Sequence, residues 1–117
     1  MRRRALLAAV LLPAASYAEE RVSLEGVWRG RLGKTGDGVA LTFTIRNHGA
    51  GMLRIGDSGG DQHFPIRAAS TRPDRIIIEA SAVSGRFEGA AAMDGKLEGV
   101  WLQANARHPL TLNRTPA

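Results

Sequence analysis

The stretch Val-Ala-Leu-Thr-Phe-Thr-Ile-Arg at residues 39–46 decides the fold of this chain. Its large apolar side chains, Val39, Leu41, Phe43 and Ile45, occupy every second position, and alanine, threonine or arginine stands at the positions between them. A period of two residues is typical of a β-strand that buries one face and leaves the other in contact with solvent. The stretch therefore predicts a half-buried strand within a sheet.

Further segments with a comparable strand-like composition lie on both sides of this stretch. They span residues 27–32, 52–56, 64–68, 75–80, 85–91, 96–103 and 109–113. The connections between them are short and rich in glycine, asparagine and aspartate, which favour tight turns and leave no room for a crossover helix. The pattern predicts an all-β, antiparallel up-and-down fold of about eight strands, either a barrel or a sandwich.

The N-terminal residues 1–18 have the pattern of a cleavable signal peptide. Arg2–Arg4 precede an apolar stretch at residues 5–15, and small residues lead to a cleavage site after Ala18. This order of regions is that of a secretory signal, and the apolar stretch is too short to anchor the chain in a bilayer. We expect residues 19–117 to form one periplasmic or secreted domain, with general secretory and twin-arginine export both open.

The charge and the cysteine content limit the possible partners. The formal net charge is +5, but without Arg2–Arg4 thirteen basic residues stand against eleven acidic ones, interspersed along the chain. We therefore expect no nucleic-acid partner. Charged side chains at the outward positions Arg29, Arg31 and Arg46 also argue against a barrel that spans a membrane.

Because there is no cysteine, stability must come from packing, which favours a closed sheet.

The pentapeptide Leu-Glu-Gly-Val-Trp occurs twice, at residues 24–28 and at residues 97–101. In a strand, its leucine, glycine and tryptophan share one face, and the glycine leaves space beside the indole ring. Alternation of large and small interior residues suits a small, strongly curved barrel. A chance repetition of a short β-rich word remains the alternative.

Several short motifs resemble a bacterial lipocalin-like domain of the calycin type, found alone or ahead of exported α/β-hydrolase domains. The motifs are Gly26-x-Trp28-x-Gly30, residues 53–58, Phe64-Pro65-Ile66, Phe87-x-Gly89, residues 94–103 and residues 109–114, the last ending at Arg114. This resemblance implies an eight-stranded up-and-down barrel over residues 19–117. No hydrolase segment follows in this sequence, so we expect no enzymatic activity to carry over.

Five residues are predicted to have structural roles in such a barrel. Trp28 and Arg114 should meet at one end, where the guanidinium group can rest on the indole ring and close the barrel. Gly30, Gly89 and Gly99 should face the interior, where they either leave a cavity or permit tight coiling of the strands.

The opposite end of the barrel, which we call the mouth, gathers the candidate ligand-binding residues, because ligands of small barrels enter there. These candidates are Phe43, Asp57, Ser58, Gln62, His63, Phe87, Trp101 and Gln103. The interior is expected to be lined by Leu41, Phe43, Ile45, Ile76, Ile78, Phe87, Leu97, Trp101, Leu110 and Leu112. The leading hypothesis is an exported binding module for a small, partly apolar ligand. The alternative is a ligand-free interaction, inhibitor or accessory domain that acts through its loops.

Two motifs could indicate chemistry, and neither is expected to carry it. Gly56–Gly60 is similar to the segment around the nucleophile of chymotrypsin-like proteases, but only His48 precedes Ser58 to serve as its base. The histidines His63 and His108 lack the i, i+2 or i, i+4 spacing that a metal-binding strand or helix requires. We therefore expect no catalytic residue, no metal and no cofactor.

Overall fold

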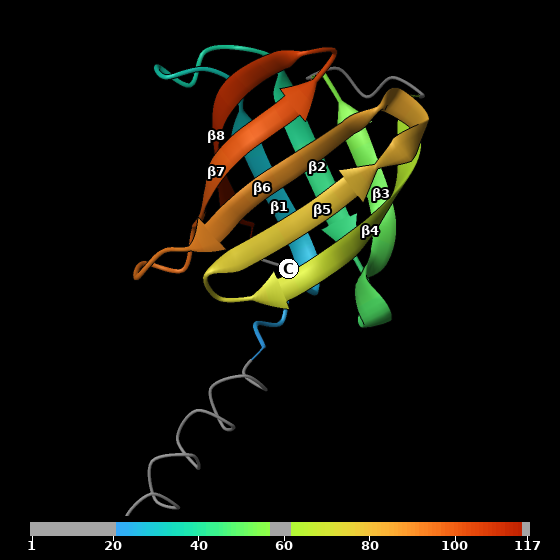
Figure 1. Ribbon diagram of the computed structural model, residues 1–117, viewed down its shortest axis with the longest axis vertical. Helices are drawn as coiled ribbons and strands as arrows, with labels where there is room; N and C mark the ends of the chain where they lie inside the picture. The colour runs from blue at the N-terminus through green and yellow to red at the C-terminus, as the bar shows by residue number, and fades with distance from the viewer. Residues whose placement is uncertain (1–20, 57–61, 116–117) are drawn as a thin grey trace, which may run out of the picture.

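The computed structural model describes residues 21–56 and 62–115 and contains a closed antiparallel barrel of eight strands in sequence order (Figure 1). The strands are β1 (Gly26–Arg31), β2 (Ala40–Ile45), β3 (Ala50–Ile55), β4 (His63–Arg72), β5 (Arg75–Ala80), β6 (Gly85–Ala91), β7 (Leu97–Gln103) and β8 (Ala106–Arg114). The sheet closes where β8 returns to β1, through the pairs Trp28–Arg114 and Arg29–Asn113. The predicted all-β, eight-stranded antiparallel barrel is confirmed. No helix in the described part of the chain is long and apolar enough to cross a membrane.

The largest difference from the predicted strands is in β4. The expected strand ended at Ala68, but the ladder continues to Arg72, with a bulge between Ala68 and Ser70. The Ser70 hydroxyl donates a hydrogen bond to the carbonyl of Arg75 at 2.5 Å, across the hairpin to β5. A bulge shifts the alternation of faces by one residue, which conceals the strand from a search for period two.

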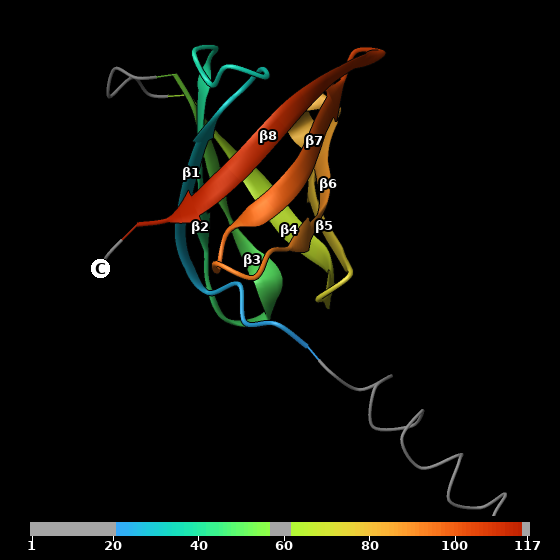
Figure 2. The same cartoon turned by 90° about the vertical axis from the view of Figure 1, so that its left-hand side faces the viewer.

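The two ends of the barrel carry different connections (Figure 2). The β1–β2 loop, the 3-10 turn η2 (Ser81–Val83) and the β7–β8 hairpin lie at the mouth. The hairpin turns at Ala104 and Asn105, whose φ angles of 51° and 65° are those of a two-residue turn that matches strand twist. The 3-10 turn η1 (Asn47–Gly49) and the β4–β5 and β6–β7 turns lie at the other end, which we call the base. The alternation of turns between two ends is as expected from the meander.

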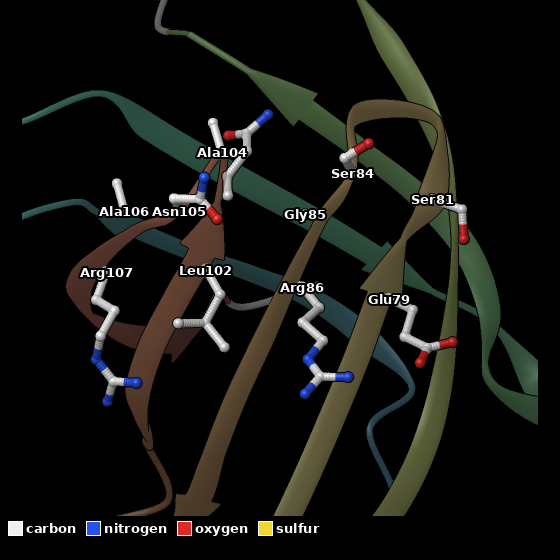
Figure 3. Close-up of a pocket in the computed structure, with 11 residues that line it drawn as sticks. Glu79, Ser81, Ser84, Gly85, Arg86, Leu102, Ala104, Asn105, Ala106 and Arg107 are labelled. Atoms are coloured by element: carbon white, nitrogen blue, oxygen red, sulfur yellow. The ribbon is translucent and has the colours of Figure 1, made fainter.

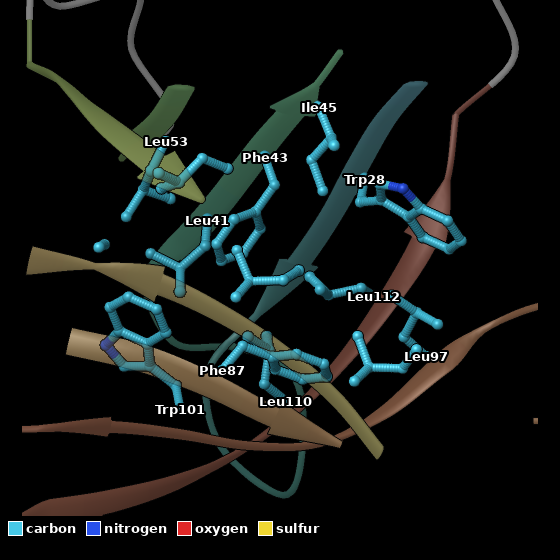
Figure 4. Close-up of a cluster of buried hydrophobic side chains, with 14 of the residues drawn as sticks. Trp28, Leu41, Phe43, Ile45, Leu53, Phe87, Leu97, Trp101, Leu110 and Leu112 are labelled. Atoms are coloured by element: carbon cyan, nitrogen blue, oxygen red, sulfur yellow. The ribbon is translucent and has the colours of Figure 1, made fainter. Parts of the chain in front are cut away.

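The interior of the barrel is a single apolar core (Figure 4). All ten residues expected to line the interior are buried, and Leu24, Trp28, Leu53 and Ile66 join them. Val39 is an exception to the predicted alternation: it lies ahead of β2 and is 50% exposed. The strand begins one residue later because the chain there is still leaving the β1–β2 loop.

The interior-facing glycines lie where two strands approach closely. Gly89 and Gly99 are register partners in β6 and β7. A Cβ atom on Gly99 would stand 2.0 Å from the carbonyl oxygen of Glu88, and one on Gly30 would stand 2.2 Å from that of Thr111. These contacts leave no room for a side chain, so the glycines permit the close approach and tight coiling of the strands.

The segment before β1 closes the base of the barrel. Trp28 is 1% exposed, and its Nε1 donates to the carbonyl of Leu24 at 2.9 Å. Arg114 from β8 donates hydrogen bonds to the carbonyls of Ser23, at 2.8 Å, and of Glu25. The guanidinium carbon of Arg114 lies 4.3 Å from the centroid of the Trp28 ring. The predicted contact between Arg114 and Trp28 is therefore present, and it also fixes the N-terminal segment.

Replacing Arg114 tests this closure. Arg114→Ala removes two hydrogen bonds and a cation–π contact at a solvent-exposed position, so we expect the free energy of unfolding to fall by about 1–2 kcal/mol. Arg114→Lys keeps a cation over Trp28 but loses the planar, two-pronged donor, and its stability should fall between that of the parent and that of the alanine variant. Urea titration monitored by tryptophan fluorescence measures both. An alanine variant as stable as the parent would contradict this role.

Candidate functional site

The aromatic residues predicted to bind a ligand form the centre of the core. Phe43, Phe87 and Trp101 are 0%, 0% and 1% exposed. The rings of Phe43 and Trp101 meet edge to face, with centroids 6.0 Å apart and an interplanar angle of 63°. Phe87 pairs with Trp101 across β6 and β7. Figure 4 shows the three side chains directed into the barrel from separate strands.

The burial of this cluster bears on whether the barrel holds a ligand. A cavity wide enough for a water molecule would leave its lining atoms accessible, yet Leu41, Leu53, Ile78, Leu110 and Leu112 are each 0–2% exposed. The side chains therefore leave no space wide enough for a water molecule around these residues, as is usual in a close-packed protein core. An eight-stranded barrel is just wide enough for its interior to be filled in this way. A ligand could enter the centre only by displacing these side chains.

Gln103 was also predicted to bind a ligand, and its side chain has two internal partners. The indole Nε1 of Trp101 donates to Gln103 Oε1 at 3.0 Å, and Gln103 Nε2 donates to the carbonyl of Val83 at 2.9 Å. Gln103 therefore links the buried indole to the η2 turn at the mouth.

The remaining predicted ligand-binding residues do not join this cluster. Gln62 and His63 are exposed, and His63 begins β4, where it pairs with Arg54 of β3. Asp57 and Ser58 lie outside the described residues. The structure thus brings Phe43, Phe87, Trp101 and Gln103 together, but as parts of the core.

The histidines do not assemble a metal site in the part of the chain that the structure describes. His108 is half-buried on β8 opposite Trp101, whereas His63 is on β4, which is not adjacent to β8. Within residues 21–56 and 62–115, no group of three or more histidine or carboxylate side chains is close enough to hold a metal ion.

Open hollows occur on the outer surface close to the mouth, and sequence reasoning did not predict them. The first, which we call the hairpin hollow, has a volume of about 740 Å³ (Figure 3). It is lined by Glu79, Ser81, Ser84, Gly85, Arg86, Leu102, Gln103, Ala104, Asn105, Ala106 and Arg107. Leu102 pairs with Arg86 on one side and Arg107 on the other, and Arg86 forms an ion pair with Glu88.

The second, which we call the β1–β8 hollow, has a volume of about 630 Å³. It is lined by Arg29, Gly30, Arg31, Gly33, Lys34, Thr35, Gly36, Ala40, Pro109, Leu110, Thr111 and Asn113. The two strands pair at Arg29 and Asn113, and the Gly33 N–H donates to the carbonyl of Pro109 at 2.9 Å nearer the mouth. In the sequence, Arg29 and Arg31 at alternate positions of β1 were the pattern that could have indicated this hollow. That pattern was used only as evidence that this face of the strand is in contact with solvent.

Comparison with known proteins identifies no relative. No protein-family model, curated protein or solved structure matches this chain. The fold and the site geometry therefore carry the functional argument alone.

Proposed function

We propose that this protein is an exported, non-enzymatic, lipocalin-like interaction module with a filled barrel, which acts through its outer surface close to the mouth. The observation that carries the proposal is the burial of Phe43, Phe87 and Trp101 at 0–1% exposure. A carrier that binds inside its barrel needs a cavity there, because small-molecule sites bury most of the ligand surface within a preformed space. The positions of the hairpin hollow and the β1–β8 hollow outside the barrel support a surface role.

The lipocalin-like assignment rests on the resemblance of the motifs together with the closed eight-stranded meander. The contact of Trp28 with Arg114 supports it, since these are the residues that the resemblance places at the first and last strands. Export rests on the pattern of residues 1–18 alone.

The non-enzymatic part of the proposal rests on the sequence pattern. Only His48 precedes Ser58 in the segment that is similar to the one around the nucleophile of chymotrypsin-like proteases, and that chemistry needs both a histidine base and a buried acid that orients it.

Native mass spectrometry of the full chain, expressed in a bacterium and recovered from the periplasm without detergent, tests this function. We expect a polypeptide that begins at Glu19 and carries no added mass. A small apolar molecule that remains bound and is released on denaturation would contradict the filled barrel. An unprocessed chain retained in the cytoplasm would contradict export.

A further inference from the structure

The acidic side chains of the barrel wall are confined to part of the sheet. Within the eight strands, carboxylates occur only at Glu79 in β5, Glu88 in β6 and Glu98 in β7. Strands β1, β3, β4 and β8 contain arginines and no carboxylate, and β2 contains neither. One side of the barrel wall is therefore basic, and the β1–β8 hollow is on that side.

Three cationic side chains line the β1–β8 hollow, and none of the described residues that line it is a carboxylate. Arg29 and Arg31 point to the same face of β1, and two residues of strand span about 7 Å. Lys34 follows in the loop. Arg31 donates to the carbonyl of Gly38 at 3.1 Å, which orients its guanidinium group. Across the described residues, 21–56 and 62–115, no ion pair joins Arg29 or Lys34 to a carboxylate.

Neutral hydrogen-bonding side chains surround these cations. Thr111 and Asn113 reach the hollow from β8. Thr35 reaches it from the loop, where its hydroxyl donates to Asp37 Oδ1 at 2.7 Å. Hydroxyl and amide groups can each donate and accept, so they match the hydroxyl groups of a sugar. The lining thus combines fixed positive charge with groups suited to a polyhydroxylated ligand.

The neighbouring Thr42 provides an independent observation. It lies on the outer face of β2, paired with Arg29 on one side and Arg54 on the other, yet it is only 8% exposed. Thr42 Oγ1 and Arg54 Nε are both buried without a hydrogen-bond partner. Buried polar groups usually have partners. Thr42 is the register partner of Arg29, which lines the hollow, whereas Thr42 and Arg54 themselves do not line it.

We propose that the β1–β8 hollow binds an anionic sugar, with an oxyanion on Arg29 and ring hydroxyls on Thr111 and Asn113. Arginine binds carboxylate and phosphate groups through paired, charge-assisted hydrogen bonds. The volume of about 630 Å³ is within the range of small-ligand sites. This inference builds on the proposed function, since it assigns a ligand class to the outer surface.

Isothermal titration calorimetry on the exported, processed protein at low salt tests the site. The probes are trigalacturonate, which carries carboxylates, glucose 1,6-bisphosphate, which carries phosphates, and neutral maltotriose. We expect one of the two anionic sugars to bind and maltotriose to give no heat. Arg29→Gln should weaken that binding by about tenfold, as expected for the loss of one charged contact.

Arg75→Gln is the matched control, because it removes the same charge from an exposed position at the start of β5, outside the hollow. It should change the affinity by less than about twofold if the site is specific, since remote surface charges are screened by salt. Lys34→Gln, in a loop, gives a second variant that does not alter the sheet. An equal loss in Arg75→Gln, equal binding of maltotriose, or binding only to anionic lipid vesicles would overturn the proposal.

The absence of heat with both anionic sugars at millimolar concentration would also overturn it. That result would not contradict the filled barrel. Native mass spectrometry tests the filled barrel by looking for a bound molecule, and these titrations do not.

Discussion

Gly99→Ala is expected to destabilise the barrel by about 3 kcal/mol or more, at the upper end of the range for overpacked cores. The new Cβ would stand 2.0 Å from the carbonyl oxygen of Glu88 and 2.5 Å from the Cα of Gly89. Both atoms belong to the backbone of β6, so no side-chain rotation relieves the clash and the two strands must separate. The free energy of unfolding of a small domain is only about 5–15 kcal/mol, so this loss is a large fraction of the total stability.

Urea titration followed by tryptophan fluorescence measures this effect. Gly95→Asn is the control, because a Cβ atom at Gly95 would have no neighbouring atom within 4 Å and asparagine tolerates the positive φ of 86° at this position. We expect the control to change the free energy of unfolding by less than about 1 kcal/mol. A Gly99→Ala protein as stable as the control would show that β6 and β7 can move apart without cost.

Trp101→Ala should cost about 3–5 kcal/mol, the usual range for deleting a buried aromatic side chain. The substitution removes the edge-to-face contact with Phe43 and leaves Gln103 Oε1 without its indole donor. It also empties the space beside Gly85, where a Cβ atom would come within 2.5 Å of the indole ring. The structure is expected to lose stability both from the cavity and from the unpaired amide oxygen.

Met93→Ala is the matched control for this prediction. It removes a large apolar side chain that is fully exposed, at 106% of the reference area. We expect its unfolding free energy to stay within about 0.5 kcal/mol of the parent, as for most surface substitutions. Chemical denaturation measures both variants side by side. A similar loss of unfolding free energy in Trp101→Ala and in Met93→Ala would contradict the account.

The strands that sequence reasoning placed correctly are those with uninterrupted alternation. The observed β5 and β6 have the predicted ends, β2 is shorter by one residue at each end, and β7 begins one residue later than predicted. The end of β4 was missed because a bulge at Ala68–Ser70 interrupts the period of two. Small residues such as alanine and serine also give a weak strand signal.

The repeated pentapeptide shows why local sequence could not determine the base of the barrel. At residues 97–101 it forms part of a regular strand, with Leu97 and Trp101 buried on one face. At residues 24–28 the strand begins only at Gly26, whose φ of 126° turns the chain, and Leu24 lies ahead of it. Arg114, which is distant in sequence, donates to the carbonyl of Glu25 in the first copy and to that of Ser23 just ahead of it.

The candidate site was predictable only in part. The topology placed Trp101 and Gln103 near the mouth correctly, but it could not show that their polar groups bind each other. Whether an eight-stranded interior is filled depends on the summed volumes of side chains from every strand, which no single motif contains. The β1–β8 hollow was missed because it depends on how β8 meets β1 and on the path of the loop after Arg31.

The filled barrel is the central claim, and a xenon-pressurised crystal of the processed protein tests it most directly. Xenon enters apolar cavities, including those made by deleting one large side chain, so a Trp101→Ala crystal serves as the positive control. We expect xenon in the space vacated in the variant and none inside the parent barrel. Xenon or ligand density among Phe43, Phe87 and Trp101 of the parent would contradict the account and favour a carrier with an internal site.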